Sequence, residues 1–128
     1  MNDRSPMPLL LKRWLPFALF LALCIGIIAG ADRGGLRAFL NLVASVPFLD
    51  KVGHVALIGS LAYLFNRALG GRRLGPFQLG GLIVAACMTA EEFSQLWFPT
   101  RTFDLLDLTA NYTGVACAEI AWRVRSSG

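Results

Sequence analysis

Four long apolar runs, separated by short charged segments, limit what this chain can fold into. They cover residues 14–31, 52–69, 77–98 and 108–122 of the 128-residue sequence. At 1.5 Å per residue, about 20 helical residues cross the ~30 Å hydrocarbon layer of a membrane, and only the fourth run is clearly short of that length. Hydrophobic residues make up 55% of the chain, which is more than one small core can bury. The sequence therefore predicts a single all-α domain, residues 1–128, that forms an integral membrane bundle of four transmembrane helices.

The segment between the first two runs, "GLRAFLNLVASVPF", has the pattern of a short amphipathic helix. Its apolar and polar residues alternate with helical spacing, so they fall on opposite faces. This pattern predicts a short helix lying in the membrane interface, and it equally fits a buried cap over the bundle. The apolar face comprises Leu36, Phe39, Leu40 and Val43, and the polar face comprises Arg37, Asn41 and Ser45.

The first run has two interpretations. It follows Lys12 and Arg13, and Ala29-Gly30-Ala31 before Asp32 imitates a signal-peptide cleavage site. However, the run is longer than the usual apolar region of a signal peptide, about 7–15 residues. We therefore expect this segment to be retained as a membrane anchor.

The distribution of Lys and Arg predicts the orientation of the helices. Cytoplasmic flanks of membrane helices are enriched in these residues, so the more basic side is expected to be inside and both termini cytoplasmic. One side of the predicted bundle holds eight basic residues, Arg4, Lys12, Arg13, Arg67, Arg72, Arg73, Arg123 and Arg125, and the other holds Arg33, Arg37, Lys51 and Arg101.

Several functional classes are not supported by the sequence. The basic residues occur in short clusters between apolar runs, which is typical of topology signals rather than of a nucleic-acid surface. Cys24, Cys87 and Cys117 all lie inside apolar runs without metal-ligand or disulfide spacing. A single histidine without an HxxxH pair argues against a metal site, and no cofactor motif is present.

Most of the acidic residues belong to the predicted outer end of the bundle. In "DKVGH", Asp50 and His54 are four residues apart and share one face of a helix. In "EEFSQ", Glu92 and Gln95 are three residues apart. The stripe Asp104, Asp107, Asn111 and Gly114 follows helical steps of three, four and three, and Gly114 would let a neighbouring helix approach closely.

These residues allow two interpretations, which are compatible with each other. In the functional one, they form a polar pocket open to the outside, in which His54 and Glu92 are acid–base candidates. In the structural one, the same residues form an ion-pair and hydrogen-bond network that fixes helix packing, with Arg101 bound to Asp104 or Asp107 and His54 bound to a carboxylate. If the motifs form one site, we expect His54 to lie within hydrogen-bond reach of Glu92 or Asp50. The candidate ligand-binding residues of the pocket are Asp50, Lys51, Gln95, Arg101, Asp107 and Asn111, with Lys51 and Arg101 expected to hold an anionic group.

The combined motifs resemble the VanZ-like family of small bacterial membrane proteins. The family pattern is D-K-x-x-H, then E-x-x-Q, then R-x(5)-D-x-x-x-N-x-x-G, and residues 48–120 contain all of it. The matching residues are Asp50, Lys51, His54, Glu92, Gln95, Arg101, Asp107, Asn111 and Gly114. Glu91 and Asp104 are additions to the pattern.

The resemblance implies a multi-pass protein of the bacterial cytoplasmic membrane with a role in the cell envelope. The family is associated by name with low-level resistance to teicoplanin, a glycopeptide. We therefore expect the outer cluster to bind, or to modify, a polar lipid headgroup or a cell-wall precursor. The sequence does not decide between binding and catalysis. Two other classes remain open, a small proton-coupled transporter or channel and a non-catalytic membrane scaffold, and the short chain leaves room for a homodimer or a partner subunit.

Overall fold

The computed structural model describes residues 8–32, 34–35, 37–97 and 103–128. Within these residues the chain is all-α apart from one minimal hairpin, which confirms the all-α part of the prediction. Helices α1, α3, α4 and α5 take up the four apolar runs, and α2 takes up the segment between the first two. The elements are α1 (Leu9–Asp32), α2 (Arg37–Ser45), α3 (Leu49–Ala68), β1 (Arg73–Leu74), β2 (Phe77–Gln78), α4 (Leu79–Ser94), the 3-10 helix η1 (Gln95–Trp97) and α5 (Leu105–Ser126).

The third apolar run begins as a strand, not as a helix. Phe77 and Gln78 pair antiparallel with Leu74 and Arg73. Gly75, between the strands, has a φ of 62°, which residues with a side chain rarely adopt, and it makes this tight turn possible. The expected span 77–98 was therefore wrong at its start, because α4 begins at Leu79, and Phe98 lies outside the described residues.

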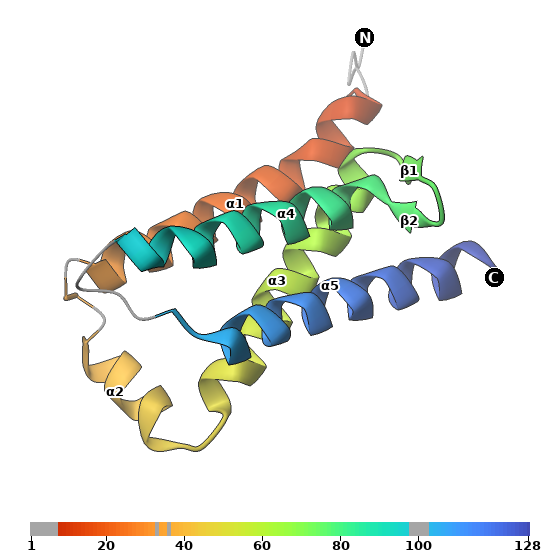
Figure 1. Ribbon diagram of the computed structural model, residues 1–128. Coiled ribbons are helices and arrows are strands. Elements are labelled where there is room, and N and C mark those ends of the chain that lie inside the picture. The colour runs from red at the N-terminus through yellow and green to blue at the C-terminus, as the bar shows by residue number, and fades with distance from the viewer. Residues whose placement is uncertain (1–7, 33, 36, 98–102) are drawn as a thin grey trace, which may run out of the picture.

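Helix α3 lies at the centre of the fold and contacts α1, α4 and α5 (Figure 1). The buried core is small and consists of Leu61 and Ala62 of α3, Val84 of α4 and Ala118 of α5, with aromatic side chains of α1 packed against it. Many large apolar side chains on the outer faces of α1 and α5 remain exposed, among them Leu19, Leu23 and Ile120. Among the described residues, the fold thus leaves more large apolar side chains exposed than its core buries.

Two facing glycines allow α3 and α5 to pack closely. A Cβ atom on Gly114 would lie 2.7 Å from the carbonyl oxygen of Val55, and one on Gly59 would lie 2.9 Å from the carbonyl oxygen of Gly114. Real Cβ atoms do not approach backbone atoms so closely, so both positions require glycine at this helix separation. The close approach expected at Gly114 is confirmed, and Gly59 is its counterpart.

The elements are divided between two ends of the molecule (Figure 1). The beginning of α1, the β1–β2 hairpin and the carboxyl terminus lie at one end, which we call the hairpin end. Helix α2, the beginning of α3 and the beginning of α5 lie at the opposite end, which we call the α2 end. At the hairpin end, Arg13 Nη2 donates to the Ala68 carbonyl at 3.2 Å and so caps the last turn of α3 with a cation.

Helix α2 buries none of its residues, so the alternative of a buried cap over the bundle was wrong. The helix is bent by 113° from α3, and Phe48 at the break has a φ of 63°. Phe39 and Leu42 expose 59% and 65% of their surface, which is the behaviour expected of a helix that rests on lipid.

By length and composition, one helix among the described residues, α1, is able to cross a membrane. Helices α2 and α3 pass the same test only when taken together across their bend. Helix α4 has 16 residues, fewer than the ~20 of an ordinary span, and α5 carries charged residues in its first and last turns. These observations favour a membrane protein.

Candidate functional site

Lys51 is the centre of a polar cluster at the α2 end. Its Nζ lies 3.0 Å from Oδ2 of Asp50 and 3.0 Å from Oδ2 of Asp104, and it also donates to Oδ1 of Asp107. The cluster therefore joins the first turn of α3 to the first turn of α5. The hydrogen bond to Asp107 raises the pKa of Lys51, and the hydrogen bonds from Lys51 hold the pKa values of Asp50 and Asp104 below their usual range.

Asp104 connects this cluster to a third helix. It is the N-cap of α5, where its Oδ1 accepts a hydrogen bond from the backbone N–H of Leu106 at 2.8 Å. Its own backbone N–H donates to Oε1 of Glu92 in α4 at 2.7 Å, and Glu92 is only 2% exposed. Sequence reasoning treated Asp104 as an addition to the family pattern, although an Asp directly before an apolar helical run is a standard N-cap signal.

His54 lies one turn below Lys51 on α3 and contacts α5. Its Nδ1 is 3.2 Å from Oδ1 of Asn111, and its Nε2 is 3.8 Å from Oδ1 of Asp107. Because an amide oxygen only accepts, Nδ1 carries the hydrogen and the neutral ring has its free lone pair on Nε2. The expected hydrogen bond from His54 to Asp50 or Glu92 was wrong in its partner, because His54 lies against Asn111 and Asp107.

The structure thus brings together most of the residues that the sequence singled out. Asp50, Lys51, His54, Asp107 and Asn111 surround one site, and Glu92 reaches it through the backbone of Asp104. The Gln95 side chain donates to Glu91 at 3.1 Å, so this bond runs along α4 and η1 and not into the cluster. Arg101, the remaining candidate, lies outside the described residues.

The balance of donors and acceptors indicates what the cluster is able to bind. An ammonium group offers three N–H donors, whereas each carboxylate accepts through two oxygens with about four lone-pair positions. Lys51 therefore cannot satisfy all the oxygens of the three aspartates around it. Asp50 and Asp104 expose 47% and 38% of their side chains, and so present oxygens to a ligand. The described part of the cluster is thus better suited to a hydrogen-bond donor than to the anion expected at Lys51.

The His54 side chain is also accessible, with 43% of its surface exposed, while its partner Asn111 is 3% exposed. A buried amide that fixes one ring nitrogen leaves the other oriented toward the cluster, which is the arrangement required for proton transfer. Among the described residues, no three His, Cys, Asp or Glu side chains are arranged to hold a metal ion.

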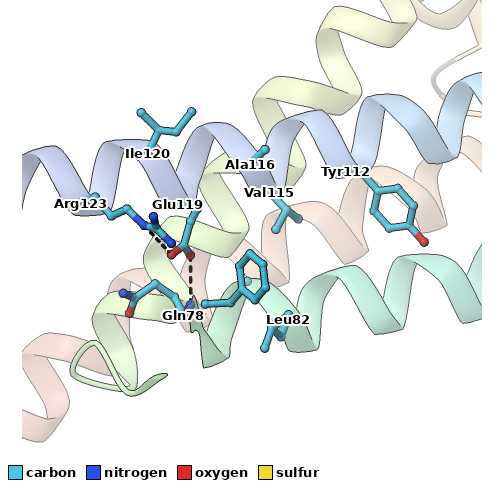
Figure 2. A pocket seen from close by; sticks show the side chains of 10 residues that line it. Gln78, Leu82, Tyr112, Val115, Ala116, Glu119, Ile120 and Arg123 are labelled. Atoms are coloured by element: carbon cyan, nitrogen blue, oxygen red, sulfur yellow. Dashed lines mark hydrogen bonds and ion pairs between the residues drawn. The ribbon is translucent and has the colours of Figure 1, made fainter. Parts of the chain in front are cut away.

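A second polar group lies at the hairpin end, on a cavity of about 380 Å³ between α4 and α5 (Figure 2). Glu119 accepts from Arg123 Nε and from the backbone N–H of Gln78, each at 3.1 Å. Arg123 also donates to the Pro76 carbonyl at 2.8 Å. These bonds tie the hairpin to α5, and the rest of the cavity is lined mainly by apolar side chains such as Leu82, Val115 and Ile120.

Comparison with protein-family models, curated proteins and solved structures gives no match for this chain. The resemblance to the VanZ-like family therefore depends on the residues of the motifs alone.

Proposed function

We propose that this chain is a VanZ-like, multi-pass protein of the bacterial cytoplasmic membrane, in which α1, α3, α4 and α5 cross the bilayer. Both termini and the hairpin would be cytoplasmic, and α2 would lie in the outer interface. The uncovered apolar faces of α1 and α5 support this arrangement, because soluble monomers rarely expose apolar surface continuously. The basic residues at the hairpin end support the orientation, because cytoplasmic flanks are rich in Arg. These described residues are Lys12, Arg13, Arg67, Arg72, Arg73, Arg123 and Arg125.

The proposed function is the binding of a polar lipid headgroup or cell-wall precursor at the cluster around Lys51. One observation carries the proposal: three carboxylates and an accessible imidazole, brought from two helices, meet at a single point of the α2 end. Ionisable residues within membrane-spanning helices are costly to maintain and usually mark functional sites.

Each residue has a separate role in this proposal. Asp50 and Asp104 hold donors of the ligand with their exposed oxygens. His54, fixed by Asn111, is the group that is placed to exchange a proton with the ligand. Glu92 is buried and bonded to the Asp104 backbone, so we assign it a positioning role instead of the acid–base role expected from its motif.

A scaffold without a ligand is the second candidate, and one observation favours it. Lys51 is bonded to three carboxylates and its side chain is only 20% exposed, as in a network that locks α3 against α5. In a scaffold, every substitution in the cluster would reduce protein abundance and function together.

The experiment compares function with abundance in a strain that lacks the gene and carries plasmid-borne variants. His54→Gln keeps a side-chain donor for Asn111 but removes the imidazole, and Asp50→Asn removes an exposed carboxylate. Ser126→Ala, at the opposite end, is the matched control. The readouts are membrane abundance by immunoblot and the profile of outer-face lipids and cell-wall precursors by mass spectrometry.

We expect His54→Gln and Asp50→Asn to accumulate like the wild type and to give the profile of the deletion strain. Ser126→Ala should restore the wild-type profile. Wild-type profiles for all three variants would refute a ligand site at the cluster. Loss of both cluster variants from the membrane would favour the scaffold.

A further inference from the structure

Lys51 belongs to two features at once, the polar cluster and an apolar groove. A cavity of about 340 Å³ runs between α3 and α5 directly below the cluster, and Lys51 forms part of its wall. The remaining wall is mostly apolar and comes from the two helices that carry the cluster. We call this groove the α3–α5 furrow, and its lining includes Phe48 just before α3, Val52 and Val55 of α3, and Leu106, Thr109 and Thr113 of α5.

The furrow continues toward the hairpin end. A second cavity of about 560 Å³ shares Val55 with the first and follows the same two helices, past Gly59 and Tyr63 of α3 and Cys117 of α5, with Phe20 of α1 also in its wall. From Phe48 to Tyr63 the furrow follows α3 for about 22 Å, since a helix rises 1.5 Å per residue. This length exceeds half of the ~30 Å hydrocarbon layer, so the furrow is long enough for the acyl chain of a lipid in one leaflet.

Phe48 stands where the furrow meets the cluster. Its φ of 63° is unusual for a residue with a bulky side chain, and its surface is 70% exposed. This conformation turns the chain from α2 into α3 and leaves the aromatic ring beside Lys51 at the mouth of the furrow.

We propose that the ligand of the polar cluster is a membrane phospholipid with an amino headgroup, whose acyl chain lies in the α3–α5 furrow. The inference rests on the proposed function and narrows its ligand from any polar envelope molecule to a lipid. The amino group follows from the exposed carboxylates of Asp50 and Asp104, because a cation among carboxylates forms strong charge-assisted hydrogen bonds. The acyl chain follows from the groove that continues from the same residues.

The test uses the purified full chain in phosphatidylcholine nanodiscs that contain a trace of photoreactive lipid. The probe is phosphatidylethanolamine with a diazirine in the middle of one acyl chain, and the comparison probe is phosphatidylglycerol with the same chain. After illumination, mass spectrometry of peptides maps the adducts. We expect adducts in the furrow segments of α3 and α5 to be about tenfold more frequent with the amino headgroup, since one charge-assisted hydrogen bond is worth about a factor of ten in affinity.

Matched variants separate the furrow from the rest of the lipid-facing surface. Thr109→Trp fills the furrow near the cluster, and Thr113→Trp fills it one turn lower, in case the first variant does not fold. Ala116→Trp places the same side chain in the other groove, between α4 and α5 (Figure 2). We expect both furrow variants to lose the headgroup-dependent adducts and Ala116→Trp to keep them. Asp50→Asn should reduce the preference for phosphatidylethanolamine.

Three results would overturn the inference: equal labelling by the two headgroups, furrow adducts that survive both tryptophan variants, and a furrow occupied by a second copy of the chain, seen as a peptide cross-link between copies.

Failure of the lipid inference is distinguishable from failure of the proposed function. If His54→Gln loses the envelope profile while Thr109→Trp keeps both profile and adducts, the furrow inference fails and the proposed function stands. If the adducts behave as expected while no cluster variant changes the profile, the proposed function fails.

Discussion

Replacing Gly114 by alanine tests whether the contact between α3 and α5 is as close as the structure has it. The new Cβ would lie 2.7 Å from the Val55 carbonyl oxygen and 2.9 Å from the Gly59 backbone nitrogen. Both atoms belong to the backbone of α3, so no side chain is able to move away and the helices must separate. Overpacking of this kind costs about 1–3 kcal/mol, and the higher helix propensity of alanine returns about 0.5–1 kcal/mol. We therefore expect Gly114→Ala to lower the free energy of unfolding by up to about 2.5 kcal/mol, with a central value of about 1 kcal/mol.

Gly53→Ala is the matched control, because Gly53 lies in α3 and a Cβ there has nothing within 4 Å. It should be neutral or should stabilise the protein by up to about 1 kcal/mol. Thermal unfolding in detergent, followed by tryptophan fluorescence, measures both variants, and 1 kcal/mol corresponds to a shift of about 4 °C for a chain of this size. Equal melting temperatures for the two variants would refute the close contact.

Three further predictions follow from the cluster and from α1. Lys51→Met and Asp107→Asn should show a coupling energy of about 1 kcal/mol in a double-mutant cycle of unfolding, because the two side chains are bonded and largely shielded; additive effects would contradict the ion pair. The pKa values of Asp50 and Asp104 are lowered in the folded state, so their contribution to stability is present above their unfolded pKa of about 3.9 and is lost as the pH falls through the folded value. An acid titration of unfolding should therefore show wild-type stability falling below about pH 4, and Lys51→Met should flatten that fall. The amino-terminal segment should be retained, since its apolar run, residues 14–31, is longer than the usual apolar region of a signal peptide, about 7–15 residues, and intact-mass measurement should find no product that begins at Asp32.

The sequence predicts helices well here because each apolar run is long and carries few internal charges. The sequence-based prediction fails at the hairpin, because Phe77 and Gln78 directly precede the apolar residues of α4 and were counted in the same run. The glycine at position 75 was the available signal, because a positive φ between two short extended segments favours a turn over a helix.

The site was predictable as a group of residues but not as a set of partners. Helical spacing places Lys51 and His54 on one face of α3, and Asp107 and Asn111 on one face of α5. Which pairs meet depends on how far the two helices slide along each other, and that register is fixed by the contact of Gly59 with Gly114. For this reason the motif spacing could not show that His54 bonds to Asn111, or that Lys51 is enclosed by aspartates.

The proposed role requires that the α2 end, with its polar cluster, face the outside of the cell. Two nearly isosteric substitutions test this, Ser45→Cys at the end of α2 and Ser126→Cys at the end of α5, each in a chain whose three native cysteines are replaced by alanine. Both serines are exposed. A membrane-impermeant maleimide should label Ser45→Cys in intact cells and should label Ser126→Cys only after the cells are permeabilised. The reverse pattern would place the cluster in the cytoplasm and contradict a role at the outer face of the membrane.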